Sequence, residues 1–199
     1  GFFIMLLILL PLCGNIDYVL GLWLVDVPAH TANFVVLVLL YSLLDGILTP
    51  IAIGVFAQGE IKAYEIALCI IYAVNFIASY VCLKLGMAPE TVFVLNIAFK
   101  ACVLADLLVH SKAKYAFPVH AFLKQCLLPS AVVFVLSGAF TYFMPWEAPN
   151  SFWEFLLHTL AIIICTSLMA LAIGMTKGER LFLKKNLRDK ITVKLYRKI

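Results

Sequence analysis

Four ionisable side chains stand within long apolar runs, and they are the residues with which this chain could do chemistry. The four are Asp17, Asp45, Lys100 and Asp106. A charged group at membrane depth is costly, so it usually faces a bundle interior, a water-filled cavity or a charged ligand. Lys100 needs a counter-charge or an anionic ligand. We predict that Lys100 binds an anionic substrate, with Asp45, Asp17 and Asp106 as further candidates for ion coupling or cavity polarity.

The partners of these polar groups are expected on other helices. Asp106 follows Lys100 by six residues, which is about 240° around a helix, so the two do not share a face. Asp45 lies in another apolar run and could pair with Lys100. The alternatives are an anionic ligand and a purely structural ion pair with another carboxylate. Asn75, in a third run, is expected to hydrogen-bond a neighbouring helix rather than a ligand.

Two of the apolar runs contain residues that disturb a helix. Gly46 and Pro50 follow Asp45 in the second run, so we expect the helix to be bent or loosened there. Pro11 and Gly14 interrupt the first run. A Pro–Gly break in a span predicts either a moving joint or a static kink satisfied by its neighbours.

No constellation of residues in the sequence is typical of an enzyme. It has no HExxH, no GxSxG, no phosphate-binding glycine loop and no cluster of metal ligands. We therefore expect no enzymatic activity, no catalytic residue, no metal and no cofactor. The six cysteines are scattered through apolar runs without a CxxC pair, which favours reduced packing residues.

The elements that must position these residues are membrane-spanning helices. Hydrophobic residues make up 64% of the 199 residues and charged residues 13%, whereas a soluble domain is nearer half apolar and a quarter charged. Six segments reach the roughly 20 apolar residues that a span needs. They cover 2–24, 32–57, 63–83, 91–109, 121–144 and 152–175. The sequence predicts an all-α, polytopic transmembrane bundle of six spans.

The positive charges predict the orientation of this bundle. All but two of the 15 Lys and Arg residues lie near 58–62, near 111–124 or in the tail 176–199. This bias points to a membrane topology rather than to nucleic acid, and it places the N-terminal end of this chain and its C-terminus in the cytoplasm. The three tryptophans fall at the opposite boundary, as expected of an interfacial belt. They are Trp23, Trp146 and Trp153.

The tail alternates apolar and basic residues with a helical period. Apolar residues recur at every fourth position from 183 to 199, and basic residues occupy the other faces. This pattern predicts an amphipathic helix lying on the anionic lipids of the inner leaflet. The alternative is a frayed, charged terminus.

Several motifs occur in an order typical of one transporter family. They lie in NIDYVLGLWLVDVPAHT, in YSLLDGILTPIAIGVFAQGEIKAYEI with its G-x-x-K-x-Y turn, and in NFIASYVCLKLGMAPETVF. In order and spacing, residues 10–110 resemble the C-terminal half of bacterial polysaccharide (O-antigen or capsule-type) repeat-unit flippases. These belong to the multidrug/oligosaccharidyl-lipid/polysaccharide exporter superfamily, with a MATE-like fold. The rest of the chain is similar by architecture alone.

The resemblance implies a domain organisation. Residues 1–110 would form four spans of the second lobe of a two-lobed transporter, 111–175 two additional C-terminal spans, and 176–199 a basic cytoplasmic tail. Gly1 opens directly into an apolar run, so we expect a longer protein that continues upstream.

The resemblance also implies a function. The whole protein would move an undecaprenyl-pyrophosphate-linked oligosaccharide across the bacterial inner membrane by alternating access, for surface polysaccharide synthesis. Its expected partners are this lipid-linked substrate, membrane lipids, a coupling ion (H⁺ or Na⁺), and a polysaccharide polymerase and glycosyltransferases. The alternatives are a multidrug or lipid-precursor exporter of the same superfamily, or a polytopic membrane enzyme of polyprenyl-linked glycan synthesis.

Overall fold

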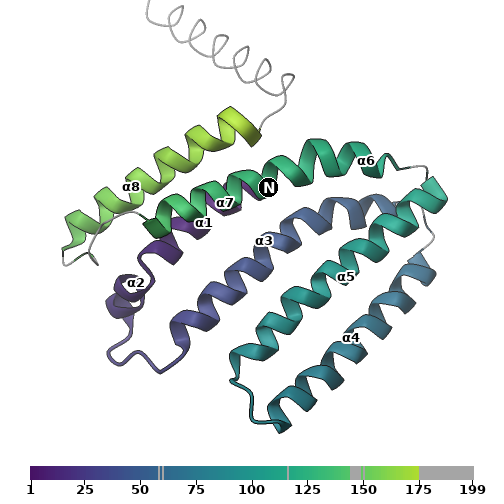
Figure 1. Ribbon diagram of the computed structural model, residues 1–199, viewed down its shortest axis with the longest axis horizontal. Helices are drawn as coiled ribbons and strands as arrows, with labels where there is room; N and C mark the ends of the chain where they lie inside the picture. Colours follow the sequence, from purple (N-terminus) through teal and green to yellow (C-terminus); the bar gives the residue numbers. More distant parts are fainter. Residues whose placement is uncertain (58, 60, 116, 144–148, 150, 175–199) are drawn as a thin grey trace, which may run out of the picture.

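The computed structural model describes all residues except 58, 60, 116, 144–148, 150 and 175–199. Within the described residues, every regular element is helical, as predicted (Figure 1). The elements are α1 (Phe2–Gly14), α2 (Ile16–Trp23), α3 (Thr31–Phe56), α4 (Ile61–Lys84), α5 (Glu90–Tyr115), α6 (Val119–Phe122), the π-helical turn η1 (Leu123–Leu127), α7 (Leu128–Phe143), α8 (Phe152–Met169) and a second π-helical turn, η2 (Ala170–Gly174).

Five stretches are long and apolar enough to cross a membrane. They are Thr31–Phe56, Ile61–Lys84, Glu90–Ala113, Val119–Phe143 and Phe152–Gly174. Each overlaps one of the predicted spans closely. The chain therefore has the character of a multi-pass membrane protein.

The first predicted span, 2–24, is broken rather than continuous. α1 and α2 meet at an 80° bend, and the chain has six spans if this pair counts as one and five otherwise. The bend is at Asn15, whose backbone leaves the helical region and whose side-chain amide donates to the Pro11 carbonyl at 3.0 Å. Asn15 is buried, and its backbone N–H donates to the same carbonyl at 3.2 Å, so the Pro11 carbonyl accepts two hydrogen bonds and the buried amide has a partner.

The long helix Val119–Phe143 contains one wide turn. η1 is followed directly by α7, whose second residue is Pro129. Proline has no N–H and its ring collides with the carbonyl four residues earlier, so a wider turn relieves the crowding without ending the helix. By contrast, α3 continues as one helix through Pro50.

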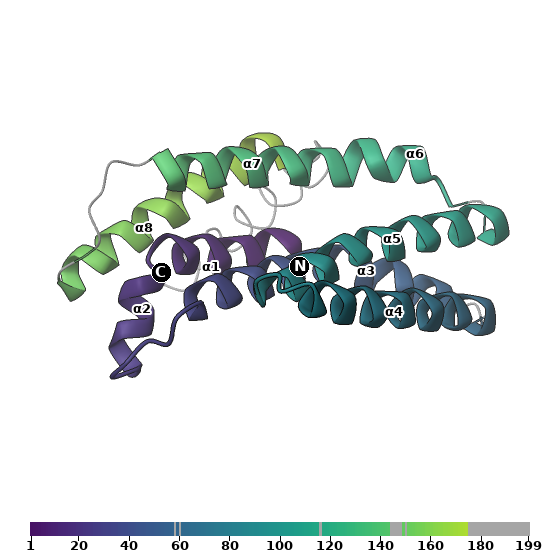
Figure 2. The ribbon, with the colours of Figure 1, turned by 60° about the horizontal axis from the view of Figure 1, so that its bottom comes forward.

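The helices form two groups, which are visible in two views (Figures 1 and 2). In the first, which we call the α3–α4–α5 layer, α5 packs between α3 and α4. In the second, the α1–α7–α8 group, α1 packs against both α7 and α8. Leu43 of α3 joins the apolar core of the second group, where it packs with Leu6 and Val133. α3 is therefore the element that connects the two groups.

The turn between α4 and α5 sets the register of the two helices. Gly86 has a positive φ of 78°, its N–H donates to Leu83, and the N–H of Met87 donates to Cys82. This is the Schellman arrangement, which needs a left-handed residue and favours glycine. It ends α4 sharply and lets α5 begin at Glu90, four residues later.

Much of the apolar surface is not covered by this chain. Only 6% of the apolar window of α4 and 17% of that of α5 is buried. These side chains require lipid or further helices as their surroundings. The predicted amphipathic tail, 176–199, and Trp146 lie outside the described residues.

Candidate functional site

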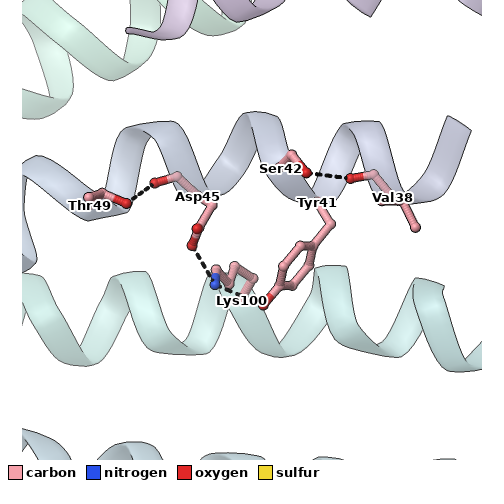
Figure 3. A network of polar contacts seen from close by, with 6 residues as sticks. All are labelled: Val38, Tyr41, Ser42, Asp45, Thr49 and Lys100. Atoms are coloured by element: carbon pink, nitrogen blue, oxygen red, sulfur yellow. Dashed lines mark hydrogen bonds and ion pairs between the residues drawn. The ribbon is translucent and has the colours of Figure 1, made fainter. Parts of the chain in front are cut away.

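The centre of the candidate site is a Lys–Asp ion pair between α5 and α3. The ammonium of Lys100 lies 2.6 Å from a carboxylate oxygen of Asp45 (Figure 3). It also donates a hydrogen bond of 2.9 Å to the hydroxyl of Tyr41 and sits 4.4 Å from the centre of that ring. Of the alternatives left open by the sequence, the structure has the interhelical pair with Asp45.

The spacing on α3 explains why two side chains reach the same ammonium. Tyr41 and Asp45 are four residues apart, so they lie one above the other on one face of the helix. The hydroxyls of Ser42 and Thr49 instead donate to carbonyls of α3 itself, at 2.9 and 2.8 Å. They are therefore satisfied locally and leave the contact with α5 to Tyr41 and Asp45 (Figure 3).

The two charges of the pair differ in their access to the surroundings. The side chain of Lys100 is 8% exposed, whereas that of Asp45 is 50% exposed. An ammonium has three donors, and Asp45 and Tyr41 account for two of them. Asp45 thus neutralises the buried cation, and it occupies the side from which a ligand could approach.

Polar contacts continue from this pair to α4. The phenol of Tyr72 on α4 lies near that of Tyr41. Further along, the Asn75 amide donates to the Asn96 side-chain oxygen at 2.5 Å, so the interhelical hydrogen bond expected of Asn75 is present. Asn96 and Lys100 are four residues apart and share a face of α5. The layer therefore carries a line of polar groups across α3, α4 and α5.

The other two predicted acids are not part of this site. Asp106 pairs with His110, one turn further along α5, at 3.2 Å. This agrees with the expectation that Asp106 and Lys100 point to different faces. Asp17 is exposed in the first turn of α2. Of the four candidates, only Lys100 and Asp45 come together.

Two parts of the arrangement were not predicted from the sequence. Tyr41 and Asn96 each lie four residues before a predicted site residue, a spacing that places them on the same helix face as that residue. At the other end of the layer, Glu90 at the start of α5 pairs with His30 and accepts a hydrogen bond from Asn33 at 3.2 Å. This contact ties the N-terminal ends of α3 and α5 together.

An apolar cavity of about 320 Å³ lies between the two helix groups. Its walls include Leu44, which lies on the same helix as Asp45, Ile97, which precedes Lys100 by three residues, and Phe134 from α7. Neither member of the ion pair is among its lining residues. A cavity with such walls is suited to an apolar group.

No group of three or more metal-ligating side chains occurs among the described residues. The groups that make up the candidate site are an ammonium, a carboxylate, phenols and amides. Comparison with protein-family models, with curated proteins and with solved structures finds no match to this chain.

Proposed function

We propose that this chain is the C-terminal part of a flippase that moves undecaprenyl-pyrophosphate-linked oligosaccharide across the bacterial inner membrane. The observation that carries the proposal is the Lys100–Asp45 pair, in which a buried cation is covered by a half-exposed carboxylate. A transporter of an anionic lipid needs a cation at membrane depth that is stable when empty. It also needs a counter-charge that can yield to the substrate.

The chemistry of the pair fits an exchange of anions. A pyrophosphate offers several charged oxygens, and an ammonium binds phosphate as a point charge. The substrate would displace Asp45 from Lys100, and Asp45 would return when the substrate leaves. The cation then never lacks a partner, which avoids the cost of an isolated charge at membrane depth.

The apolar surroundings support an amphiphilic substrate. The cavity between the helix groups offers a hydrocarbon chain an apolar place against α3, the helix that carries Asp45. Neither the glycan nor the pyrophosphate can cross hydrocarbon unaided, so both need a polar path through the protein. In this proposal the first lobe, which is not part of this chain, completes that path, and the N-terminal end of this chain and its C-terminus are cytoplasmic.

Export by the full-length protein tests the proposal. Lys100→Ala should lower surface polysaccharide by about tenfold or more, since hydrogen bonds to charged groups contribute about 1.5–3 kcal/mol. Lys100→Arg should retain a substantial part of the export because the charge remains. Lys112→Ala, on the same helix but exposed, is the matched control. Normal export by Lys100→Ala at normal protein level would remove Lys100 from the substrate path.

A second candidate is an exporter of organic cations in the same superfamily. The observation that favours it is the exposed half of Asp45, which could attract a cationic drug. In that case Asp45→Asn should raise drug accumulation in cells and leave surface polysaccharide unchanged. The opposite pattern supports the flippase. The remaining alternative, a polytopic enzyme, has no cluster of catalytic groups in its favour among the described residues.

A further inference from the structure

A groove between α4 and α5 lies on a part of the layer that the anion exchange does not use. It has a volume of about 350 Å³, which is within the roughly 300–1,000 Å³ of small-molecule sites. One face of α4 lines it at helical spacing from Tyr72 to Leu83, and α5 contributes Val92 and Asn96. The groove therefore follows the two helices lengthwise.

The groove has the chemistry of a site for a neutral, hydroxylated ligand. Its polar lining consists of the amides of Asn75 and Asn96 and the hydroxyls of Tyr72, Ser79 and Tyr80, and none of its lining residues is charged. Amides and hydroxyls both donate and accept hydrogen bonds. Aromatic rings offer a flat apolar face beside a polar tip. A sugar ring presents the complementary groups, since it has hydroxyls around its edge and C–H bonds on its faces.

Asn75 supplies an independent observation that points to a ligand. Its side chain is buried, with 8% exposure, and its oxygen has no hydrogen-bond partner. A buried acceptor without a partner is costly and calls for an explanation. If the oxygen and nitrogen positions of both amides are exchanged, Asn75 has a spare donor instead of a spare acceptor. A ligand hydroxyl satisfies either arrangement because it is both donor and acceptor.

The groove also adjoins the cation of the proposed exchange. Asn96 precedes Lys100 by four residues on the same face of α5, which is about 6 Å along the helix axis. At the α4 side, the phenol of Tyr72 lies near that of Tyr41, which receives a hydrogen bond from Lys100. A molecule whose anionic group lies at Lys100 would extend its next unit into the groove.

We infer that the groove between α4 and α5 binds the sugar that is joined directly to the pyrophosphate of the substrate. The inference rests on the proposed function, and it assigns separate residues to the two parts of the head group. Lys100 holds the pyrophosphate. Asn75 holds a hydroxyl or amide of the first sugar, with Tyr72, Ser79 and Asn96 beside it.

Binding of three probes to the purified full-length protein in detergent tests the inference. The probes are geranyl pyrophosphate and the same molecule carrying one N-acetylglucosamine or one glucose on its pyrophosphate. We expect at least one sugar-bearing probe to bind about 3–10-fold more tightly than geranyl pyrophosphate, as one or two hydrogen bonds provide. Asn75→Leu should abolish this difference and leave the affinity for geranyl pyrophosphate unchanged. Lys100→Ala should weaken the binding of all probes.

The Asn75–Asn96 contact also holds two helices together, so a second variant guards against a loss of folding. Asn75→Leu/Asn96→Leu replaces both partners with apolar groups, which can be nearly neutral for stability. It should bind all the probes equally, as Asn75→Leu does. Equal affinity of the wild type for all probes, or an equal effect of Asn75→Leu on all of them, would overturn the sugar subsite alone. A wild type that binds none of them would overturn the proposed function as well.

Discussion

The α3–α4–α5 layer and the α1–α7–α8 group are built from similar apolar helices, but different contacts hold them together. In the layer, polar side chains reach from helix to helix, as in the pairs Lys100–Asp45 and Asn75–Asn96. In the other group, the hydroxyl of Ser137 donates to the weakly accepting sulfur of Met169 at 3.3 Å, Thr141 donates to a carbonyl of its own helix, and the core consists of aliphatic side chains. A polar contact in lipid costs more to build than an apolar one. We therefore expect the function to lie in the layer. We expect the other group to be a scaffold, with a structural role only.

The largest expected effect comes from removing the carboxylate that pairs with the ammonium of Lys100. Asp45→Leu should lower the free energy of unfolding of the full-length protein by about 3 kcal/mol, because a buried charge loses its partner. Adding Lys100→Leu should recover most of this loss, since two apolar side chains then meet. Thermal unfolding in detergent measures both. The double variant should remain inactive in export, and recovery of export would mean that the pair is purely structural.

A smaller effect is expected in the scaffold. A Cβ atom at Gly174 would lie 2.4 Å from the ring of Phe3, so Gly174→Ala should cost about 2 kcal/mol through overpacking. Gly138→Ala, in the same group, meets nothing within 4 Å and should be neutral or slightly stabilising. Export per folded molecule should be unchanged in both variants. A specific loss of export in Gly174→Ala would contradict the division into layer and scaffold.

The smallest effect is expected at the end of the layer where α3 and α5 begin. Glu90→Gln keeps the shape of the side chain but removes its charge, which should weaken the contacts to His30 and Asn33. Amide hydrogen exchange should become faster at the first turns of α3 and α5 and stay unchanged around Lys100. Glu65→Gln, on an exposed position of α4, is the control. Faster exchange throughout α5 would show that the end contact supports the whole layer.

Much of the helical architecture was predictable because lipid imposes a simple length requirement. Each of the five long spans follows from an apolar run bounded by turn residues. The break at Asn15 illustrates the limit. The sequence marked Pro11 and Gly14 as an interruption, but apolar length does not reveal that the Asn15 amide turns back to the Pro11 carbonyl. The direction of the bend depends on how the two halves of the broken span pack against the neighbouring helices.

The charged residues of the site were predictable from the sequence, whereas its neutral residues were not. The cost of a charge in lipid singled out Lys100 and Asp45, which the structure joins. The choice between Asp45 and another carboxylate needed the packing of α3 against α5. Tyr41 and Asn96 carry no charge and so gave no comparable signal. The spacing of four residues from Asp45 and Lys100 becomes informative only once the helix faces are known.

The wide turn η1 has a consequence for how this helix tolerates insertions and deletions. One additional residue in a helix rotates everything after it by about 100°. Ser130, Val133 and Ser137 are the buried side of α7, and Phe122, before the turn, packs on the core of the other helix group. Because a π-helical turn holds about one residue more than an α-helical turn, removing a single residue between 123 and 127 should let an ordinary turn form and keep the buried side of α7 on its core. This segment therefore determines how the side chains before and after it are rotated relative to one another about the axis of one membrane helix.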